Sequence, residues 1–334
     1  MPAANRSAQS KPDANNLEGL VIRAQSGFLT VRTKRGDYTC RVRGKLKQIK
    51  VDQPRGDIVA VGDRVLISPQ EDYSGSIETI LPRSSAFSRK KIIGSNEFDY
   101  QRIILANPDQ VVLVFACAKP EPHLRMLDRF LVITESQGIP ALIVVNKLDL
   151  CDLQQVREKF IIYEELGYHV IYTSAKTMQG VSELRDQLTG KISVLSGPSG
   201  VGKSSLLNAI QPELGLEVRA VSEATEKGRH TTQVRELFAL HAGGYVADIP
   251  GIRTIALWDI EPEELDGYFP EIRARVAQCQ FNDCTHSHEP GCAVIAAVAS
   301  GVIDAGRYQS YLRLRFNGGS FDDEELDLLD DPSE

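Results

Sequence analysis

The order of two nucleotide-binding motifs constrains this chain more than any other feature. The tetrapeptide Asn146-Lys147-Leu148-Asp149 precedes the loop Gly197-Pro198-Ser199-Gly200-Val201-Gly202-Lys203-Ser204, whereas an N-K-x-D motif that binds guanine usually follows its phosphate loop. The loop satisfies G-x-x-x-x-G-K-[ST], whose glycines let backbone N–H groups close on phosphate oxygens. If both motifs serve one nucleotide, the domain that contains them is circularly permuted.

The flanks of the loop favour a phosphate site over an ordinary glycine-rich turn. A short apolar run at 193–196 precedes the loop, and a helical pattern starts at Lys203, which is the strand–loop–helix context that the motif requires. The helix directs its N–H groups and dipole at the phosphates. We expect residues 197–205, up to Ser205, to bind phosphate, Lys203 to act in catalysis, and Ser204 to hold Mg²⁺.

Two short motifs predict that the base is guanine. Asp149 follows the apolar run 141–145, and its carboxylate can accept both the ring N–H and the exocyclic amine of guanine, which adenine cannot satisfy. Ser174-Ala175-Lys176 follows the next run, 169–173, and there the N–H of Ala175 can reach the guanine oxygen. Each motif is weak alone, but at successive strand ends they support each other.

Two later segments complete the predicted nucleotide site. Asp248-Ile249-Pro250-Gly251 ends a strand pattern, so we expect Asp248 to hold Mg²⁺ through water and the Gly251 N–H to contact the γ-phosphate. Residues 228–232 offer a switch loop ordered by triphosphate, with Thr232, in preference to Thr231, as the Mg²⁺ ligand.

Ile252 stands where many GTPases have a glutamine that orients the attacking water. An apolar side chain cannot do this, so intrinsic turnover should be slow. His230 is the nearest titratable candidate for positioning the water, and the alternative is an ordinary surface histidine.

The apolar pattern places these motifs on a doubly wound parallel sheet. Buried runs at 111–116, 141–145, 169–173, 193–196 and 245–247 alternate with helical patterns at 124–137, 156–166 and 181–188. Ligands of such sheets bind at the carboxyl ends of the strands.

A basic β-barrel is predicted before this sheet. Residues 20–81 hold short apolar runs separated by glycines, without a long helical pattern. Cations take alternate positions, which share one face of a strand: Arg41, Arg43, Lys45 and Lys47. With Phe28 and Tyr38 as candidates for base stacking, this face favours RNA binding over a merely solvated sheet surface.

A cysteine cluster follows the sheet. Cys279-x4-Cys284-x-His286-x5-Cys292 supplies three thiols and an imidazole, a Cys₃His set that fits one structural, tetrahedral Zn²⁺. His288 remains an alternative ligand, and unligated buried cysteines are disfavoured by the polar surroundings. Farther along, a helical pattern that carries Arg307, Arg313 and Arg315 predicts a second basic surface.

Composition and charge narrow the class of protein. No apolar run approaches the ~20 residues that span a bilayer, and the first residues lack a secretory core, so we expect a cytoplasmic protein without membrane association. The net charge of −7 includes eight acids within 322–334, whereas residues 17–102 have sixteen cations against ten acids. The two ends therefore face different partners. Nothing in the pattern requires an oligomer, and we expect a monomer.

The permuted motifs, the barrel before them and the Cys₃His segment after them together resemble the RsgA (YjeQ) family of ribosome-small-subunit-dependent GTPases over residues 17–316. The resemblance implies an N-terminal OB-fold, a central circularly permuted α/β P-loop GTPase domain and a C-terminal helical zinc-binding domain. It also implies GTP hydrolysis in late maturation of the small ribosomal subunit, with that subunit, its rRNA, GTP and GDP as partners and Zn²⁺ and Mg²⁺ as cofactors. The matching motif positions are Asn146, Lys147, Asp149, 197–205, Thr232, Asp248, Gly251, Cys279, Cys284, His286 and Cys292.

The expected organisation is a disordered arm (1–16), an OB-fold RNA-binding domain (17–82), a linker (83–101), a permuted GTPase domain (102–256), a zinc-binding domain (257–316) and an acidic tail (317–334). Two other functions stay open. One is a nucleotide-gated RNA-binding module with negligible turnover, which Ile252 favours, and the other is an ATPase or kinase unconnected with RNA, which Asp149 disfavours.

Overall fold

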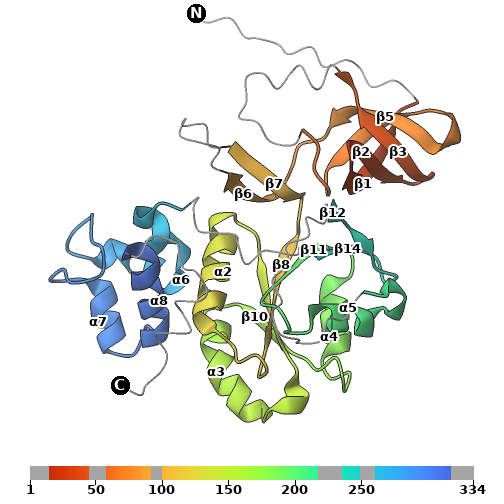
Figure 1. The fold of residues 1–334 in the computed structure, drawn as a ribbon. Coiled ribbons are helices and arrows are strands. Elements are labelled where there is room, and N and C mark those ends of the chain that lie inside the picture. Colours follow the sequence, from red (N-terminus) through yellow and green to blue (C-terminus); the bar gives the residue numbers. More distant parts are fainter. Residues whose placement is uncertain (1–14, 45–57, 92–99, 217–234, 249–259, 317–334) are drawn as a thin grey trace, which may run out of the picture.

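The computed structural model describes residues 15–44, 58–91, 100–216, 235–248 and 260–316, which form a barrel, a nucleotide domain and a helical C-terminal segment (Figure 1). The barrel contains β1 (Leu17–Gln25), β2 (Phe28–Thr33), β3 (Gly36–Val42), β4 (Arg64–Pro69) and β5 (Ser74–Ile80), with a 3-10 turn η2 (Glu71–Tyr73). The strand order is β1-β2-β3-β5-β4, and β4 pairs back with β1. This closed topology confirms the predicted OB-fold.

Side chains alternate strictly between the inside and the outside of β3. Arg41 is exposed, and its guanidinium lies 4.4 Å from the centre of the Phe28 ring. Tyr38 is buried in the barrel core, because it lies an odd number of residues from Arg41 and therefore faces inward. The prediction that Tyr38 stacks on bases is wrong.

The cationic face is shorter than its sequence pattern suggests. The strand ends at Val42, and Arg43 pairs with Glu78 of β5. Lys45 and Lys47 lie outside the described residues. Of the four alternating cations, the described strand therefore carries only Arg41.

The nucleotide domain is a doubly wound sheet. Its strands are β8 (Gln110–Ala116), β9 (Ala141–Asn146), β10 (His169–Tyr172), β11 (Ile192–Ser196), β13 (Phe238–Ala239) and β14 (Tyr245–Asp248), in the order β10-β9-β8-β11-β14-β13. The pairs are parallel except β13–β14. The helices are α2 (Leu124–Ser136), α3 (Leu153–Glu165), α4 (Val181–Leu188) and α5 (Lys203–Ile210), with 3-10 turns η3 (Leu148–Leu150) and η4 (Pro212–Leu214).

The two faces of this sheet have separate cores. On β8, Leu113 and Phe115 belong to the apolar cluster of α2 and α3, whereas Val112 and Val114 belong to the cluster of α4 and α5. Because the strand is covered on both sides, its sequence is apolar from Val111 to Ala116.

A hairpin occupies the region expected to be a linker. β6 (Ala86–Lys91) and β7 (Tyr100–Ala106) form an antiparallel two-stranded sheet. Phe87 and Leu105 are buried in the core of the nucleotide domain, and the backbone N–H and C=O of Ser88 bond the side-chain amide of Gln137, the residue after α2, at 3.1 Å each. The sequence pattern indicated a linker because the apolar positions of this hairpin are few and lie beside a run of cations.

Buried polar contacts attach the barrel to the nucleotide domain. The fully buried carboxylate of Asp63 accepts hydrogen bonds of 2.6 and 2.7 Å from the Arg83 guanidinium. The N–H of Ala106 donates to the carbonyl of Val61 at 2.8 Å. A Cβ on Gly62 would lie 2.0 Å from the Ala106 carbonyl oxygen, so only glycine fits there.

A short strand forms a second attachment. β12 (Arg235–Glu236) pairs with β1 of the barrel, and the N–H of Leu237 donates to the carbonyl of Ile22 at 2.8 Å. The next two residues form β13 in the nucleotide domain. Residues 235–239 therefore join both sheets.

The C-terminal segment comprises η6 (Pro262–Tyr268), α6 (Pro270–Arg273), η7 (Val276–Gln278), α7 (Ala293–Ala299) and α8 (Ala305–Phe316). Residues 262–278 form short turns and not one continuous helix, because Pro270 has no N–H with which to continue the preceding turns. Figure 1 shows this segment beside α2, and α8 and η6 contact that helix. None of the described helices is long and apolar enough to cross a membrane.

Arg307 does not belong to the predicted second basic surface. Its side chain is 2% exposed and lies between Asp128 of α2 and Glu271 of α6, with guanidinium-to-carboxylate distances of 2.8 Å to each. Arg315 donates to the carbonyl of Pro262 at 2.7 Å. The helix presents these cations to its own fold because α8 packs against α2 and η6.

Candidate functional site

The predicted nucleotide motifs meet at one edge of the sheet. β9 ends at Asn146, β10 at Tyr172 and β11 at Ser196, and the parallel ladders place these ends side by side with that of β8. The guanine motif thus precedes the phosphate loop in the chain, yet both lie on one edge of a single sheet. This arrangement confirms the circular permutation.

Glycines make the phosphate loop possible. Gly197 has φ 135°, and a Cβ there would lie 2.0 Å from the carbonyl oxygen of Val114 on β8. Gly202 has φ 94°, and its Cβ would lie 2.5 Å from Nδ2 of Asn146. Side chains are thus excluded by the neighbouring strands themselves. α5 begins directly after Gly202, so the free N–H groups of its first turn belong to the loop.

The ammonium of Lys203 lies across the loop. It donates to the carbonyls of Gly197 at 2.8 Å and Pro198 at 2.7 Å. These two bonds hold the ammonium at the place where the phosphate oxygens of a nucleotide are expected to bind. They also keep the loop curved around the ammonium.

Asn146 links three parts of the site. Its buried amide donates to the Val201 carbonyl at 2.9 Å, and its Oδ1 accepts from the Thr173 hydroxyl at 3.2 Å and the Ala175 N–H at 3.3 Å. The side chain therefore ties the phosphate loop to both guanine motifs, and the N–H of Ala175 lies beside the first motif as its sequence position requires.

Asp149 is held as a carboxylate. The Ser174 hydroxyl donates to its Oδ1 at 2.6 Å, and the Lys176 ammonium lies 3.7 Å from its Oδ2. The hydrogen bond from Ser174 is the main cause that lowers the pKa of Asp149 below its usual value. An ionised acceptor is what the two guanine N–H groups require.

A cysteine that the sequence analysis did not single out supports the same motif. Lys147 has a left-handed backbone, φ 68°, and its carbonyl accepts from the Cys117 thiol at 3.0 Å. The ammonium of Lys147 donates to the carbonyl of Lys119. Cys117 directly follows β8, and only the pairing of β8 with β9 identifies it as a neighbour of the motif.

The remaining predicted nucleotide residues are placed only in part. The backbone of Asp248 ends β14 beside Leu195 of β11, which puts it next to the phosphate loop. His230, Thr231, Thr232, Gly251 and Ile252 lie outside the described residues.

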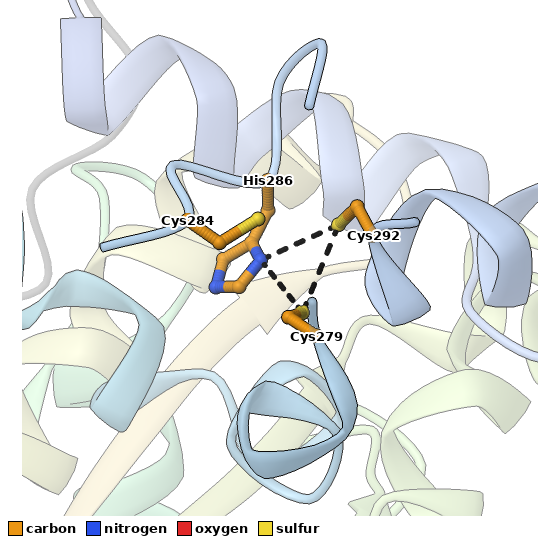
Figure 2. A group of neighbouring side chains, drawn as sticks. All are labelled: Cys279, Cys284, His286 and Cys292. Atoms are coloured by element: carbon orange, nitrogen blue, oxygen red, sulfur yellow. Dashed lines mark hydrogen bonds between the residues drawn. The ribbon is translucent and has the colours of Figure 1, made fainter. Parts of the chain in front are cut away.

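The cysteine cluster assembles a candidate metal centre (Figure 2). The ligand atoms of Cys279, Cys284, His286 and Cys292 all lie within 4.8 Å of one another. Nδ1 of His286 is 3.6 and 3.5 Å from the sulfurs of Cys279 and Cys292, which are 3.9 Å apart. With bonds of about 2.3 Å to sulfur and 2.0–2.1 Å to nitrogen, a tetrahedral Zn²⁺ has ligand separations of about 3.8 Å (S to S) and 3.6 Å (S to N). The donor atoms of Cys279, His286 and Cys292 thus already have the separations of three corners of such a tetrahedron.

The burial of the cluster favours a bound cation. Burial raises the pKa of the Cys284 thiol to about 12, so this ligand loses its proton only when an ion stabilises the thiolate. His288 is exposed, and its Nδ1 lies 2.8 Å from the Ser287 hydroxyl. The imidazole in the cluster is therefore that of His286.

Comparison with known proteins agrees with this architecture. The model of the RsgA GTPase family matches residues 80–258, and that of the RsgA N-terminal domain matches residues 18–77. Two proteins named small ribosomal subunit biogenesis GTPase RsgA are similar over 89% of this chain. The one from Gemmatimonas aurantiaca is 45% identical over 96% of its own length, and the one from Thermotoga maritima is 42% identical over 95%.

Two solved structures share the arrangement. YjeQ from Thermotoga maritima superposes with a TM-score of 0.75 at 38% identity, covering 90% of this chain and 98% of that one. YloQ, described as a circularly permuted GTPase, superposes with a TM-score of 0.69 at 33% identity, covering 93% and 97%. The chain belongs to the RsgA family of GTPases, and it is an enzyme that hydrolyses GTP.

Proposed function

We propose that this GTPase binds the small ribosomal subunit and its rRNA, and that it couples GTP hydrolysis to late maturation of that subunit. The observation that carries the proposal is the joining of the barrel to the nucleotide domain: the bond from Ala106 to Val61 and the strand β12 attach the barrel, whose surface carries Arg41 and Phe28, to the domain that holds the GTP site. The names of the relatives supply the identity of the partner.

Within this proposal each predicted residue has one task. Residues 197–205 bind the phosphates, and Asn146, Lys147, Asp149 and 174–176 bind the guanine. Ser204, Thr232 and Asp248 hold the Mg²⁺ that accompanies GTP, Lys203 stabilises charge on the phosphates, Gly251 contacts the γ-phosphate, and His230 positions the water. The contacts of Asn146 and Asp149 described above support the guanine assignment.

The metal proposal is one structural Zn²⁺ held by Cys279, Cys284, His286 and Cys292. Three thiolates with one imidazole is a donor set that zinc prefers, and the spacing of the donor atoms fits its bond lengths. We further propose that the protein acts as a monomer in the cytoplasm, where its ribosomal partner is found. We propose the domain limits 17–82 for the barrel and 257–316 for the zinc-binding segment, and a nucleotide domain that begins with hairpin β6–β7 in place of the expected 102–256.

GTP turnover measured with and without ribosomal particles tests the proposal. Phosphate release should be slow for the protein alone, rise when purified small subunits are added, and rise less with mature ribosomes. A nucleotide-gated RNA-binding module would instead bind subunits in a GTP-dependent way without any rise in turnover, and that result would overturn the coupling.

Asp149→Asn supplies a matched control for the nucleotide. The amide presents one donor and one acceptor, which suits xanthine but not guanine, so the variant should lose GTP turnover and regain it with xanthosine triphosphate. If Asp149→Asn hydrolyses GTP as the wild type does, Asp149 does not bind the base.

A further inference from the structure

The imidazole of His286 has one nitrogen whose task is unexplained. The side chain is fully buried, and its Nδ1 faces two sulfurs of the cluster. On the other side of the ring, Nε2 is buried without a hydrogen-bond partner within the described part of the chain. Buried polar atoms are rarely left in this condition, so a partner is expected close by.

A single carboxylate lies opposite this nitrogen. Oδ2 of Asp266 is 3.6 Å from Nε2, slightly beyond hydrogen-bond length. Asp266 belongs to η6, whereas the four candidate ligands come from residues 279–292. No other contact of its carboxylate is recorded among the described residues, so a movement of less than about 1 Å would make it the acceptor for this ring.

The backbone of His286 is fixed by hydrogen bonds that do not involve its ring. The Tyr308 hydroxyl donates to the His286 carbonyl at 2.7 Å, and that of Tyr311 donates to the preceding carbonyl, of Thr285, at 3.0 Å. Glu289 accepts from the N–H and hydroxyl of Thr285 and organises the loop itself. None of these groups hydrogen-bonds the imidazole, whose centre lies 6.1 Å from that of the Tyr311 ring, so a hydrogen bond that orients Nε2 has to come from Asp266.

We propose that Asp266 is a positioning residue for the metal centre, which accepts a hydrogen bond from Nε2–H of His286 when the ion is bound. The inference rests on the zinc proposed above. A metal on Nδ1 uses the lone pair of that nitrogen, so the single proton of the neutral ring must lie on Nε2 and makes it a donor. A carboxylate acceptor fixes this tautomer and makes Nδ1 a stronger ligand.

The arrangement also ties the metal centre to the chain before it. η6 is the first described element after residues 249–259, and Arg315 of α8 holds its first residue through the Pro262 carbonyl. Asp266 adds a contact from η6 to a metal ligand. The ion thus holds η6 in place in addition to closing its own loop.

The test compares zinc retention in three variants of the full-length protein. Asp266→Ala removes the acceptor and should weaken zinc binding about 10–100-fold, read as faster transfer of zinc to a chromogenic chelator. Asp266→Asn keeps the shape and a neutral acceptor and should fall between Ala and wild type. Glu263→Gln alters an exposed acid on the same element and should behave as wild type.

A second measurement separates positioning from general destabilisation. In the zinc-loaded wild type, the Nε2–H proton of His286 should be visible by NMR and protected from solvent exchange, and it should exchange rapidly in Asp266→Ala. Zinc transfer within twofold of wild type in Asp266→Ala, or an unchanged proton, overturns the proposal. If the wild type itself holds no stoichiometric zinc, the zinc proposal fails and this one fails with it. Should Asp266→Ala not fold, Asp266→Asn decides by the same two readouts.

Discussion

Replacing Arg307 by methionine is expected to loosen the C-terminal segment from the nucleotide domain by about 3–5 kcal/mol. The guanidinium is 2% exposed and bridges Asp128 on α2 to Glu271 on α6. It also lies over the ring of Phe269, 4.7 Å from its centre. Methionine fills much of the same volume, but it leaves two buried carboxylates without their cation.

The magnitude follows from the bonds that are lost and from those that remain. Arg307 makes one bond of 2.8 Å to Asp128 and two bonds, of 2.8 and 3.1 Å, to Glu271. Hydrogen bonds to charged groups contribute about 1.5–3 kcal/mol each. Part of the loss is offset, because the hydroxyls of Tyr163 and Ser310 still donate to Asp128 at 2.8 and 2.6 Å.

The loss should depend on pH in one direction. Burial already raises the pKa of Asp128, and the Arg307 cation opposes that rise. Without the cation the folded-state pKa rises further above the unfolded value, which is about 3.9. Between the unfolded and the folded pKa, the folded state keeps a proton on Asp128 that the unfolded state has lost, so the free energy of unfolding falls as the pH rises. The deficit of Arg307→Met should therefore be larger at pH 8 than at pH 5.

Hydrogen exchange of the α8 amides measures this local stability without requiring two-state unfolding of the whole chain. The companion variant Asp128→Asn/Glu271→Gln/Arg307→Met keeps acceptors for the two hydroxyls but removes the stranded charges, and it should recover about 2 kcal/mol or more. The reasoning is refuted if Arg307→Met costs less than about 1 kcal/mol, or if the triple variant is as unstable as the single one.

Three further outcomes are expected. Gly197→Ala should abolish GDP binding and lower the free energy of unfolding by more than about 3 kcal/mol, since its Cβ meets a backbone oxygen at 2.0 Å. Gly190→Ala is the control: this glycine has a positive φ but open space around it, so the variant should lose only about 1 kcal/mol. Calorimetry measures GDP binding and thermal denaturation measures the stability of both variants. Arg83→Ala leaves the buried carboxylate of Asp63 without its cation and should lower the free energy of unfolding in urea by about 3 kcal/mol. Removal of Arg64, whose exposed ion pair spans 3.8 Å, should lower it by under about 0.5 kcal/mol. Zinc removal by chelation should expose the C-terminal segment to protease while the barrel and nucleotide domain keep their circular dichroism, and unchanged cleavage would contradict a structural metal.

The nucleotide site could be predicted because its determinants are local. The phosphate loop needs glycines at fixed positions between a strand and a helix, and the guanine motifs need to follow strands, so six to ten consecutive residues carry each signal. The structure adds the reason for those glycines: Gly197 approaches β8 and Gly202 approaches Asn146, two contacts that no local pattern contains.

The barrel surface was predicted less well, because the alternation of side chains along the strand was applied to the cations but not to Tyr38. The alternation that puts Arg41 outside also puts Tyr38 inside, so the two could not share a face. Arg307 shows a different limit. A cation on a helix usually faces solvent, and only the packing of α8 against α2 brings it to two buried carboxylates that lie 179 and 36 residues away in the sequence.

The two segments that carry Thr232 and Gly251 each lead to an element that contacts an added domain. The first described residues after the Thr232 segment form β12, which pairs with β1 of the barrel. The first described element after the Gly251 segment is η6, which packs against α8 and carries Asp266. Only the second connection depends on the permutation, because in the unpermuted order the segment that carries Gly251 would lead to the guanine-binding strands and not to the metal centre. We therefore expect a change that GTP hydrolysis imposes on these two segments to reach the barrel through β12 and the metal centre through η6.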